Sequence, residues 1–362
     1  MKKIITLFVL LSALITLSAC QKPETYTFSF FQYMDTYISI NVMADSENQA
    51  NTFKTEIEAI YQMYHVLSTG YEDLSEDSEY KQNIYTINQQ NNVKLEIDKP
   101  LYDLIAEAER LKVLTDGYFD ISMGEIVSIW KTVILDEESG YLFEEIPTIV
   151  FESIMGQINA IVLEQNVIEL TEESDQYYIQ VKSTHAKLDL GAIAKGYATE
   201  RVYEYLRLQD VEFFSISAGS SSIALGKNPN RDGGIYHVSL ANPVRLSATD
   251  RTYGMIYVKD LSVTTSGNYE QYALYNSLRY HHIISPMTKT PAHYYHTLTV
   301  LGDDAGVLDA VSTALFSMSP EILNAWLLEH ADEYAFEIIR YNYDGSITTN
   351  LTSTTFEEYE EN

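Results

Sequence analysis

Two short runs of small and polar residues, at positions 189–198 and 309–316, constrain this chain more than any other feature. The first, DLGAIAKGYA, is typical of a strand end that leads into a helix, and its glycines let a backbone approach a ligand closely. The second, DAVSTALF, predicts a helix in which Asp309 and Thr313 project from one face. A carboxylate and a hydroxyl so placed suit Mg²⁺ beside phosphates. The alternative is that Asp309 caps its helix and Thr313 bonds to a carbonyl within it.

The N-terminus has the order of a bacterial lipoprotein signal. Two lysines precede an apolar run over residues 4–17, and the sequence Leu-Ser-Ala-Cys then ends at Cys20. The run is too short to span a bilayer, which favours a secretory signal. We therefore expect residues 1–19 to be a signal peptide, Cys20 to be acylated with palmitate, and residues 20–27 to form a lipidated tether. An ordinary signal peptide that ends near a cysteine by chance is the alternative.

Charge and composition limit the function classes. Cys20 is the only cysteine, which excludes a disulfide framework. The formal net charge of −29 disfavours binding to nucleic acid or to anionic lipid, so we expect the lipid to hold the protein on the outer face of the cell membrane. An anionic substrate would need local cations, from Lys195, backbone amides or a metal. The full chain is 46% hydrophobic, and the part after the tether is long enough for one large domain over residues 28–362.

Hydrophobic periodicity predicts helices and strands that do not alternate strictly. This order indicates an α+β fold with mixed or antiparallel sheets and packed helices, and argues against a doubly wound parallel sheet. Helices are expected over residues 46–64, 100–117, 194–208, 304–318 and 320–331. Strands are expected within 28–41 and over 160–163, 168–171, 177–181, 213–217, 236–240, 254–258, 261–265, 335–341 and 346–351.

Further motifs accompany the two opening segments in a fixed order. The chain carries, in sequence, MDTY at 34–37, FDISMG at 119–124, the segment 189–198, SGNY at 266–269, HIISP at 282–286 and the segment 309–316. This series resembles the ApbE family of FAD:protein FMN transferases, many of which are periplasmic or surface lipoproteins. The resemblance extends from about residue 30 to residue 340, nearly the whole chain after the signal.

The resemblance implies an ApbE-like, T-fold-like architecture and a specific reaction. FMN would move from FAD to a threonine hydroxyl of a partner protein, such as a membrane or surface redox protein, leaving a phosphoester and AMP. Mg²⁺ would be held by Asp309, Thr313 and the backbone carbonyl of Ala192, and His282 would activate the acceptor threonine. The implied FAD site consists of Met34, Tyr118, Phe119, Asp120, Asp189, Lys195 and Ile284.

The chemistry of these residue types fits such a reaction. A metal can neutralise the charge that gathers on the phosphate oxygens, and a neutral hydroxyl needs a base such as histidine. Four of the eight histidines, at 281, 282, 293 and 296, could instead suggest zinc. In an extended strand His281 and His282 point to opposite faces, which argues against one shared ion.

Each implied residue also has an ordinary structural alternative. The lysine at 195 could lie on a solvated helix face, and the carboxylates at 120 and 189 could serve turns or caps. The histidine at 282 could be a hydrogen-bonded structural residue. Met34, Tyr118 and Phe119 could be plain core.

Several positions depart from the family pattern. Ser285 replaces an aspartate before Pro286, Lys289 replaces a glycine, and Asp35 replaces another glycine. A loop that usually reads Asn-Ala-Gly-Gly-Asp reads SAGSS at 217–221. These departures leave open a flavin-binding surface lipoprotein with weak or lost transfer. A small-molecule-binding lipoprotein that feeds a transporter would show a duplicated two-lobe pattern, which the sequence lacks. The acceptor, the oligomeric state and the retention of FAD are not determined by the sequence.

Overall fold

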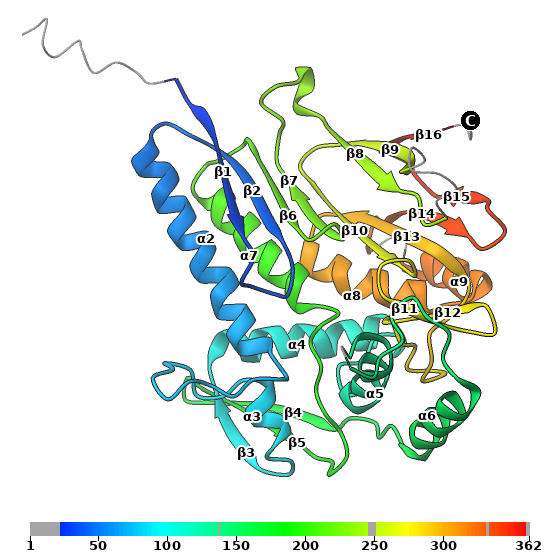
Figure 1. Ribbon diagram of the computed structural model, residues 1–362. Helices are drawn as coiled ribbons and strands as arrows, with labels where there is room; N and C mark the ends of the chain where they lie inside the picture. Colours follow the sequence, from blue (N-terminus) through cyan, green and yellow to red (C-terminus); the bar gives the residue numbers. More distant parts are fainter. Residues whose placement is uncertain (1–21, 137, 245–250, 331–332, 360–362) are drawn as a thin grey trace, which may run out of the picture.

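The computed structural model describes residues 22–136, 138–244, 251–330 and 333–359, and the predicted signal and Cys20 lie outside them. A large sheet of eight strands, antiparallel at every neighbouring pair, forms the centre of the molecule (Figure 1). In sheet order its strands are β1 (Glu24–Phe30), β2 (Ile38–Ala44), β6 (Phe214–Ala218), β7 (Ser222–Leu225), β10 (Leu261–Gly267), β13 (Tyr295–Gly302), β14 (Glu337–Asn342) and β15 (Ile347–Thr349).

Helices cover one face of this sheet. In order across it lie α2 (Glu47–Ser68) on β1 and β2, α7 (Ala194–Leu208) on β6 and β7, and α8 (Ala305–Phe316) on β10 and β13. Two more helices, α4 (Lys99–Leu114) and α9 (Pro320–His330), bury apolar side chains in the same core, and α4 packs against α2 and α8. Successive side chains of a strand point to opposite faces of the sheet. In β13, Val300 packs in the core under the helices, and Leu301 packs in the apolar cluster on the opposite face.

The opposite face of the large sheet packs against a smaller sheet. This sheet contains β8 (Tyr236–Ala241), β9 (Thr252–Val258) and β16 (Thr355–Glu358), preceded by the short 3-10 turn Asp232–Gly234. Leu240, Ile256 and Val258 supply its side of the shared apolar cluster. The large sheet is therefore covered on both faces.

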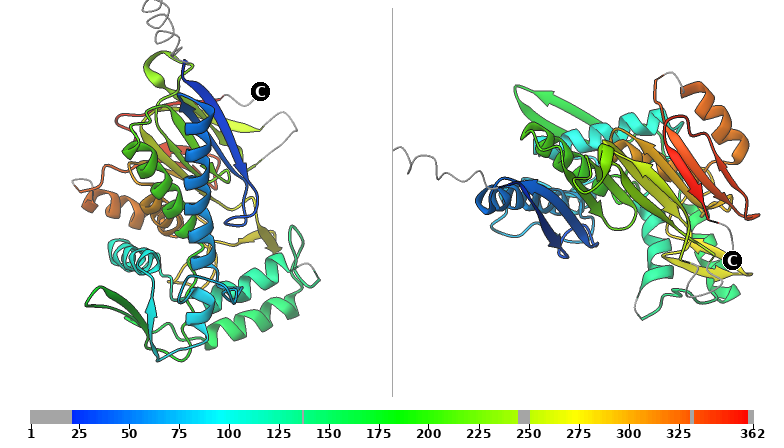
Figure 2. Two further views of the ribbon diagram at one scale, coloured as in Figure 1. Left: turned by 90° about the vertical axis from the view of Figure 1, so that its left-hand side faces the viewer. Right: turned by 90° about the horizontal axis from the view of Figure 1, so that it is seen from above.

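A separate helical region stands beside the core and below it in Figure 1. It contains α5 (Gly124–Leu135), α6 (Thr148–Ala160) and the hairpin of β11 (Tyr272–Tyr275) and β12 (Leu278–His281). These elements bury their own cluster around Trp130. A third sheet, β3 (Lys94–Ile97), β5 (Gln176–Val181) and β4 (Ile168–Glu173), lies nearby with the short helix α3 (Ile84–Asn88) (Figure 2).

The close contact between α7 and α8 explains the glycine in the first opening segment. A Cβ atom added to Gly196 would lie 2.3 Å from the carbonyl oxygen of Ala305 and 2.5 Å from the Cβ of Asp309. Only glycine therefore allows the two helices to approach this far. The packing brings together the two segments that the sequence singles out.

The α+β expectation is confirmed, and several elements match closely. The helix predicted at 194–208 has those bounds in the structure, and Ser46 caps α2 by accepting a hydrogen bond from the Gln49 backbone. The strand predicted at 160–163 is wrong. Ala160 is the last residue of the helix α6, whose buried face contains Ile154 and Ile158, one helical turn apart.

Other elements were not predicted from the sequence. The helices α5 and α6 and the strand β13 are the largest of them, and in α5 a β-branched composition obscures a helical spacing of buried residues. The start of β1 at Glu24 lies inside the predicted tether. The division into signal, tether and domain itself stays a prediction. Within the described ranges, no helix is both long enough and apolar enough to cross a bilayer.

Candidate functional site

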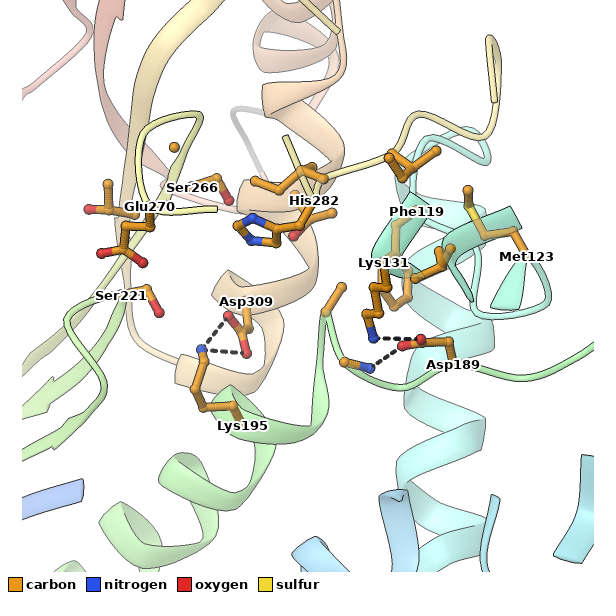
Figure 3. A pocket seen from close by; sticks show the side chains of 18 of the residues that line it. Phe119, Met123, Lys131, Asp189, Lys195, Ser221, Ser266, Glu270, His282 and Asp309 are labelled. Atoms are coloured by element: carbon orange, nitrogen blue, oxygen red, sulfur yellow. Dashed lines mark hydrogen bonds and ion pairs between the residues drawn. The ribbon is translucent and has the colours of Figure 1, made fainter. Parts of the chain in front are cut away.

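A cavity of about 220 Å³ opens where α5, α7 and α8 meet the loops that follow β10 and β12 (Figure 3). We call it the first cavity. It brings together nearly all the site residues predicted from the sequence, although they come from four separate parts of the chain. Those that line it are Tyr118, Phe119, Asp120, Asp189, Ala192, Lys195, His282, Ile284, Asp309 and Thr313.

Met34 is the exception, because it lines a second cavity of about 240 Å³ beside the first. The two cavities share Lys131, Asp189 and Lys195 on their walls, together with a glycine. Met34 and Asp35 both have left-handed backbones, with φ of 57° and 50°. Asp35 thus adopts the conformation that a glycine would take, and aspartate tolerates it better than most residues.

Lys195 and Asp309 form an ion pair across the contact between α7 and α8. The Lys195 ammonium lies 3.0 and 3.1 Å from the two carboxylate oxygens, and the backbone N–H of Gly196 donates to one of them at 2.8 Å. Asp309 is only 7% exposed, and the cap of α8 is Asp304, which accepts from the Val307 backbone at 2.9 Å. Asp309 is therefore not a helix cap, and Lys195 does not lie on a solvated face.

The predicted Mg²⁺ ligands offer oxygen donors of the right kind. Asp309 and Thr313 are one helical turn apart on α8, and both line the first cavity together with Ala192. Hard cations such as Mg²⁺ take carboxylate, hydroxyl and carbonyl oxygens, usually with several waters and phosphates. Within the described ranges, no group of three or more His, Cys, Asp or Glu residues could hold a metal. A magnesium site here would thus depend on one carboxylate and on the bound phosphates.

The two other predicted carboxylates combine a turn role with a place on the cavity wall. Asp120 accepts from the backbone and hydroxyl of Ser122, at 2.8 and 2.6 Å, and forms an ion pair with Lys112 at 2.8 Å. Asp189 accepts from the Gly191 backbone at 2.7 Å. These bonds hold each carboxylate in one orientation toward the cavity.

His282 projects into the first cavity from the loop after β12 (Figure 3). Its Nδ1 lies 3.4 Å from the Gln271 carbonyl, so a proton on Nδ1 would leave Nε2 able to accept another. Burial lowers the pKa of His282, and the nearby cations Lys131 and Lys195 act in the same direction. The hydrogen bond to the Gln271 carbonyl and the charge of Glu270 oppose them without reversing the shift. The imidazole is therefore neutral at neutral pH.

The neighbouring histidine points the other way. His281 is completely buried, its Nε2 lies 2.9 Å from the Ala292 carbonyl, and burial lowers its pKa to about 3. The opposite orientation of the two rings removes the basis for a zinc site shared between His281 and His282.

Two charged residues of the first cavity were missed by sequence reasoning. Glu270 directly follows the SGNY motif, and its carboxylate accepts from the Ser220 hydroxyl at 2.8 Å. Its position after a matched motif could have identified it. Lys131 lies on α5, which was not predicted, and its ammonium is 3.0 Å from Asp189.

Ser285 and Lys289 form a tight turn beside the cavity. Ser285 is buried, and its carbonyl accepts from the Lys289 backbone at 2.7 Å. Lys289 has a φ of 60°, the conformation that glycine adopts easily, and its own carbonyl accepts from the Trp130 indole at 3.0 Å. The backbone of a glycine position is thus kept although the residue is lysine.

Comparison with known proteins finds the same fold in solved structures. The ApbE protein from Thermotoga maritima matches with a TM-score of 0.71 and 24% identity, covering 90% of this chain and 96% of its own. The flavin transferase ApbE from Vibrio cholerae matches with a TM-score of 0.69 and 24% identity, covering 92% and 98%.

Sequence relatives cover most of the chain as well. The FAD:protein FMN transferase of Haemophilus influenzae is 28% identical over 327 residues, which is 89% of each chain. The protein of the same description from Vibrio cholerae is 28% identical over 320 residues, or 86% of this chain and 87% of its own. The family model described as the ApbE family matches residues 34–336. With that span matched and the two defining segments meeting at one cavity, the chain belongs to the ApbE family.

Proposed function

We propose that this protein is a Mg²⁺-dependent transferase that moves FMN from FAD to a threonine hydroxyl of a partner protein and releases AMP. The observation that carries the proposal is the meeting of Lys195, Asp309 and His282 at one cavity. These residues would supply a cation, a metal ligand and a base to a phosphate group bound there, which supports the proposal. The relatives described as FAD:protein FMN transferases support the same reaction.

In the proposed reaction, the threonine oxygen attacks the phosphorus of the FMN half of FAD. The bond from that phosphorus to the bridging oxygen breaks, and AMP leaves with this oxygen. Nε2 of His282 takes the threonine proton, which its lowered pKa leaves it free to accept. Lys195 offers positive charge to the phosphates, and Asp309, Thr313 and Ala192 would hold Mg²⁺, which neutralises charge on the phosphate oxygens when bound.

We further propose that the domain acts outside the cytoplasmic membrane, held there by a lipid on Cys20. The support is the order of charged, apolar and small residues before Cys20 in the sequence. Replacement of Cys20 by serine is expected to release the protein from the membrane fraction. A variant that stays membrane-bound and processed like the wild type would contradict lipidation.

The transfer is tested by intact-mass analysis of a threonine-bearing acceptor domain incubated with the protein, FAD and Mg²⁺. The expected result is a mass increase equal to FMN, abolished by a chelator. The Asp309→Ala variant should lose turnover and weaken Mg²⁺ binding measured by calorimetry with FAD present. Unchanged Mg²⁺ affinity in this variant would reject the metal assignment.

A second function is supported by two departures from the family pattern. Ser285 is buried at a position where the family pattern has a carboxylate, and the loop at 217–221 also differs. A protein that binds FAD tightly and never adds FMN to any acceptor would be a flavin-binding surface lipoprotein. The mass experiment and a flavin-binding titration, done together, separate the two functions.

A further inference from the structure

Lys131 occupies the junction of the two cavities described above. It lies in the middle of α5, and its side chain lines both the first cavity and the second. Figure 3 shows it reaching from α5 toward Asp189, on the wall that the cavities share. A ligand that extends from one cavity into the other must therefore pass this side chain.

Two hydrogen bonds hold the Lys131 ammonium at this position. It donates to the carboxylate of Asp189 at 3.0 Å and to the phenol oxygen of Tyr71 at 2.7 Å. The three residues come from α5, from the loop before α7 and from the loop after α2. An ammonium has three N–H donors, and only these two bonds are found for it within the described parts of the chain. The third donor is available to a ligand.

The ammonium keeps its charge in this setting. Burial acts against the charged form, yet Asp189 and Tyr71 together raise the pKa of Lys131 above its usual value. The group is therefore fully protonated at neutral pH, and its side chain is 31% exposed. It is a fixed positive charge within reach of both cavities.

The electrostatics of the first cavity make this charge important for an anionic ligand. Among the described residues that line it, four are carboxylates, and Lys131 and Lys195 are the two cations. Lys195 already bonds to both oxygens of Asp309. In a chain with a formal net charge of −29, a ligand carrying phosphates would meet repulsion without these two groups.

We propose that Lys131 binds the charged diphosphate linkage of a dinucleotide at the junction of the two cavities, and that it determines the preference for FAD over flavins without phosphate. This rests on the proposed function in taking FAD as the ligand. The third N–H of the ammonium donates to a phosphate oxygen while Asp189 and Tyr71 keep the side chain in place. Charge-assisted bonds of this kind are stronger than neutral ones, especially in a partly buried site.

The test measures affinity and does not depend on turnover. FAD and riboflavin are titrated separately against the full protein by quenching of flavin fluorescence, with Mg²⁺ and again with a chelator. Lys131→Met keeps most of the side-chain length and removes the charge, and Lys131→Arg keeps the charge. Lys187→Met is the matched control, because Lys187 pairs at 3.7 Å with Glu125 on the same helix, is half exposed and lines neither cavity.

We expect Lys131→Met to weaken FAD binding by about 10-fold or more and riboflavin binding by less than about 2-fold. Lys131→Arg should stay within about 3-fold of the wild type, and Lys187→Met should bind both flavins normally. The affinity of the wild type for FAD should also fall more steeply with salt than that of Lys131→Met.

Equal losses for FAD and riboflavin would overturn the proposal, because they would mean that Lys131 only supports the fold through Asp189. An unchanged FAD affinity, or a salt dependence equal to that of the wild type, would overturn it as well. If Lys131→Met fails to fold, a loss of FAD selectivity in Lys131→Arg would count against the proposal, and retained selectivity would support it. Tight FAD binding without transfer would reject the proposed function alone, whereas no FAD binding would reject both.

Discussion

The two sides of the first cavity are built differently. One side is the pair of helices α7 and α8, which belong to the large core over the central sheet. The other side is α5 with the loop that follows β12, which packs on a separate cluster around Trp130. The helical pair carries Lys195 and Asp309, and its packing admits no side chain at Gly196.

The second side rests on its own apolar cluster. It carries Lys131 and the turn of Ser285 and Lys289, and it holds His282 on a loop. Because it has its own apolar cluster, changes on it need not disturb the helical pair. The comparison teaches that the side with Lys195 and Asp309 is fixed by dense packing between two helices, whereas the side with Lys131 and His282 is expected to be adjustable. The departures from the family pattern at 285 and 289 lie on the adjustable side.

The largest effect is expected from His282→Asn, on the adjustable side. Transfer of FMN should fall by about 10²–10⁴-fold, the usual contribution of a general base, with FAD affinity nearly unchanged. Wild-type transfer should also fall as the pH drops through the pKa of His282, which lies below its usual 6.5, because the protonated ring cannot accept a proton. Rapid-quench rates across pH measure both, and an unaltered rate in the variant would remove His282 from the mechanism.

A second test addresses the fixed side through its packing. Gly196→Ala should destabilise the protein by about 1–3 kcal/mol, because the new Cβ meets the backbone of Ala305 and the side chain of Asp309. The matched control is Gly156→Ala on α6, where an added Cβ meets nothing within 4 Å, and there we expect a gain of about 0.5–1 kcal/mol. Urea unfolding measures both. A neutral Gly196→Ala would show that the helical pair is not tightly constrained.

Glu200 gives the fixed side a pH dependence. Its carboxylate accepts from the Ala305 backbone at 2.8 Å and so ties α7 to the start of α8. Burial, reinforced by Asp304, raises the pKa of Glu200 from 4.5 to about 7. The folded state therefore holds a proton that the unfolded state releases, and the contribution of Glu200 to stability falls as the pH rises from 4.5 to 7.

The substitution Glu200→Gln removes this titration and keeps an oxygen acceptor for the Ala305 N–H. The difference in unfolding free energy between variant and wild type should shift in favour of the variant by about 2–3 kcal/mol between pH 4 and pH 8. Thermal or urea unfolding across this range gives the value. Parallel pH curves for the two proteins would mean that Glu200 titrates normally.

The smallest effect is expected from Lys289→Gly on the adjustable side. Glycine would relieve a left-handed backbone, with φ of 60°, but would lose the hydrogen bond from the lysine ammonium to the Ile161 carbonyl. These changes oppose each other, so the unfolding free energy should change by less than about 1 kcal/mol. Lys289→Asn, which tolerates the same backbone, isolates the loss of the ammonium. A loss well above this range would show that the turn is as constrained as the helical pair.

Much of the fixed side could be predicted from the sequence. The period of a helix is local, so the four-residue spacing of Asp309 and Thr313 gave their common face, and α7 was bounded correctly at 194–208. The family resemblance carried by the motifs also implied ten residues that line one cavity. The helices α5 and α6 were missed altogether, because their apolar, β-branched sequences do not separate helix from strand.

The pairings between distant elements were decided only by the tertiary structure. A sequence period tells which residues of a helix share a face, but it does not tell which other element that face meets. Lys195 and Asp309 are 114 residues apart, and their ion pair depends on the close approach that Gly196 permits. Lys131 likewise reaches Asp189 only because α5 packs beside the loop that leads into α7. Local patterns thus identified most of the residues that line the site. The packing of elements far apart in the chain determined which of these residues are in contact.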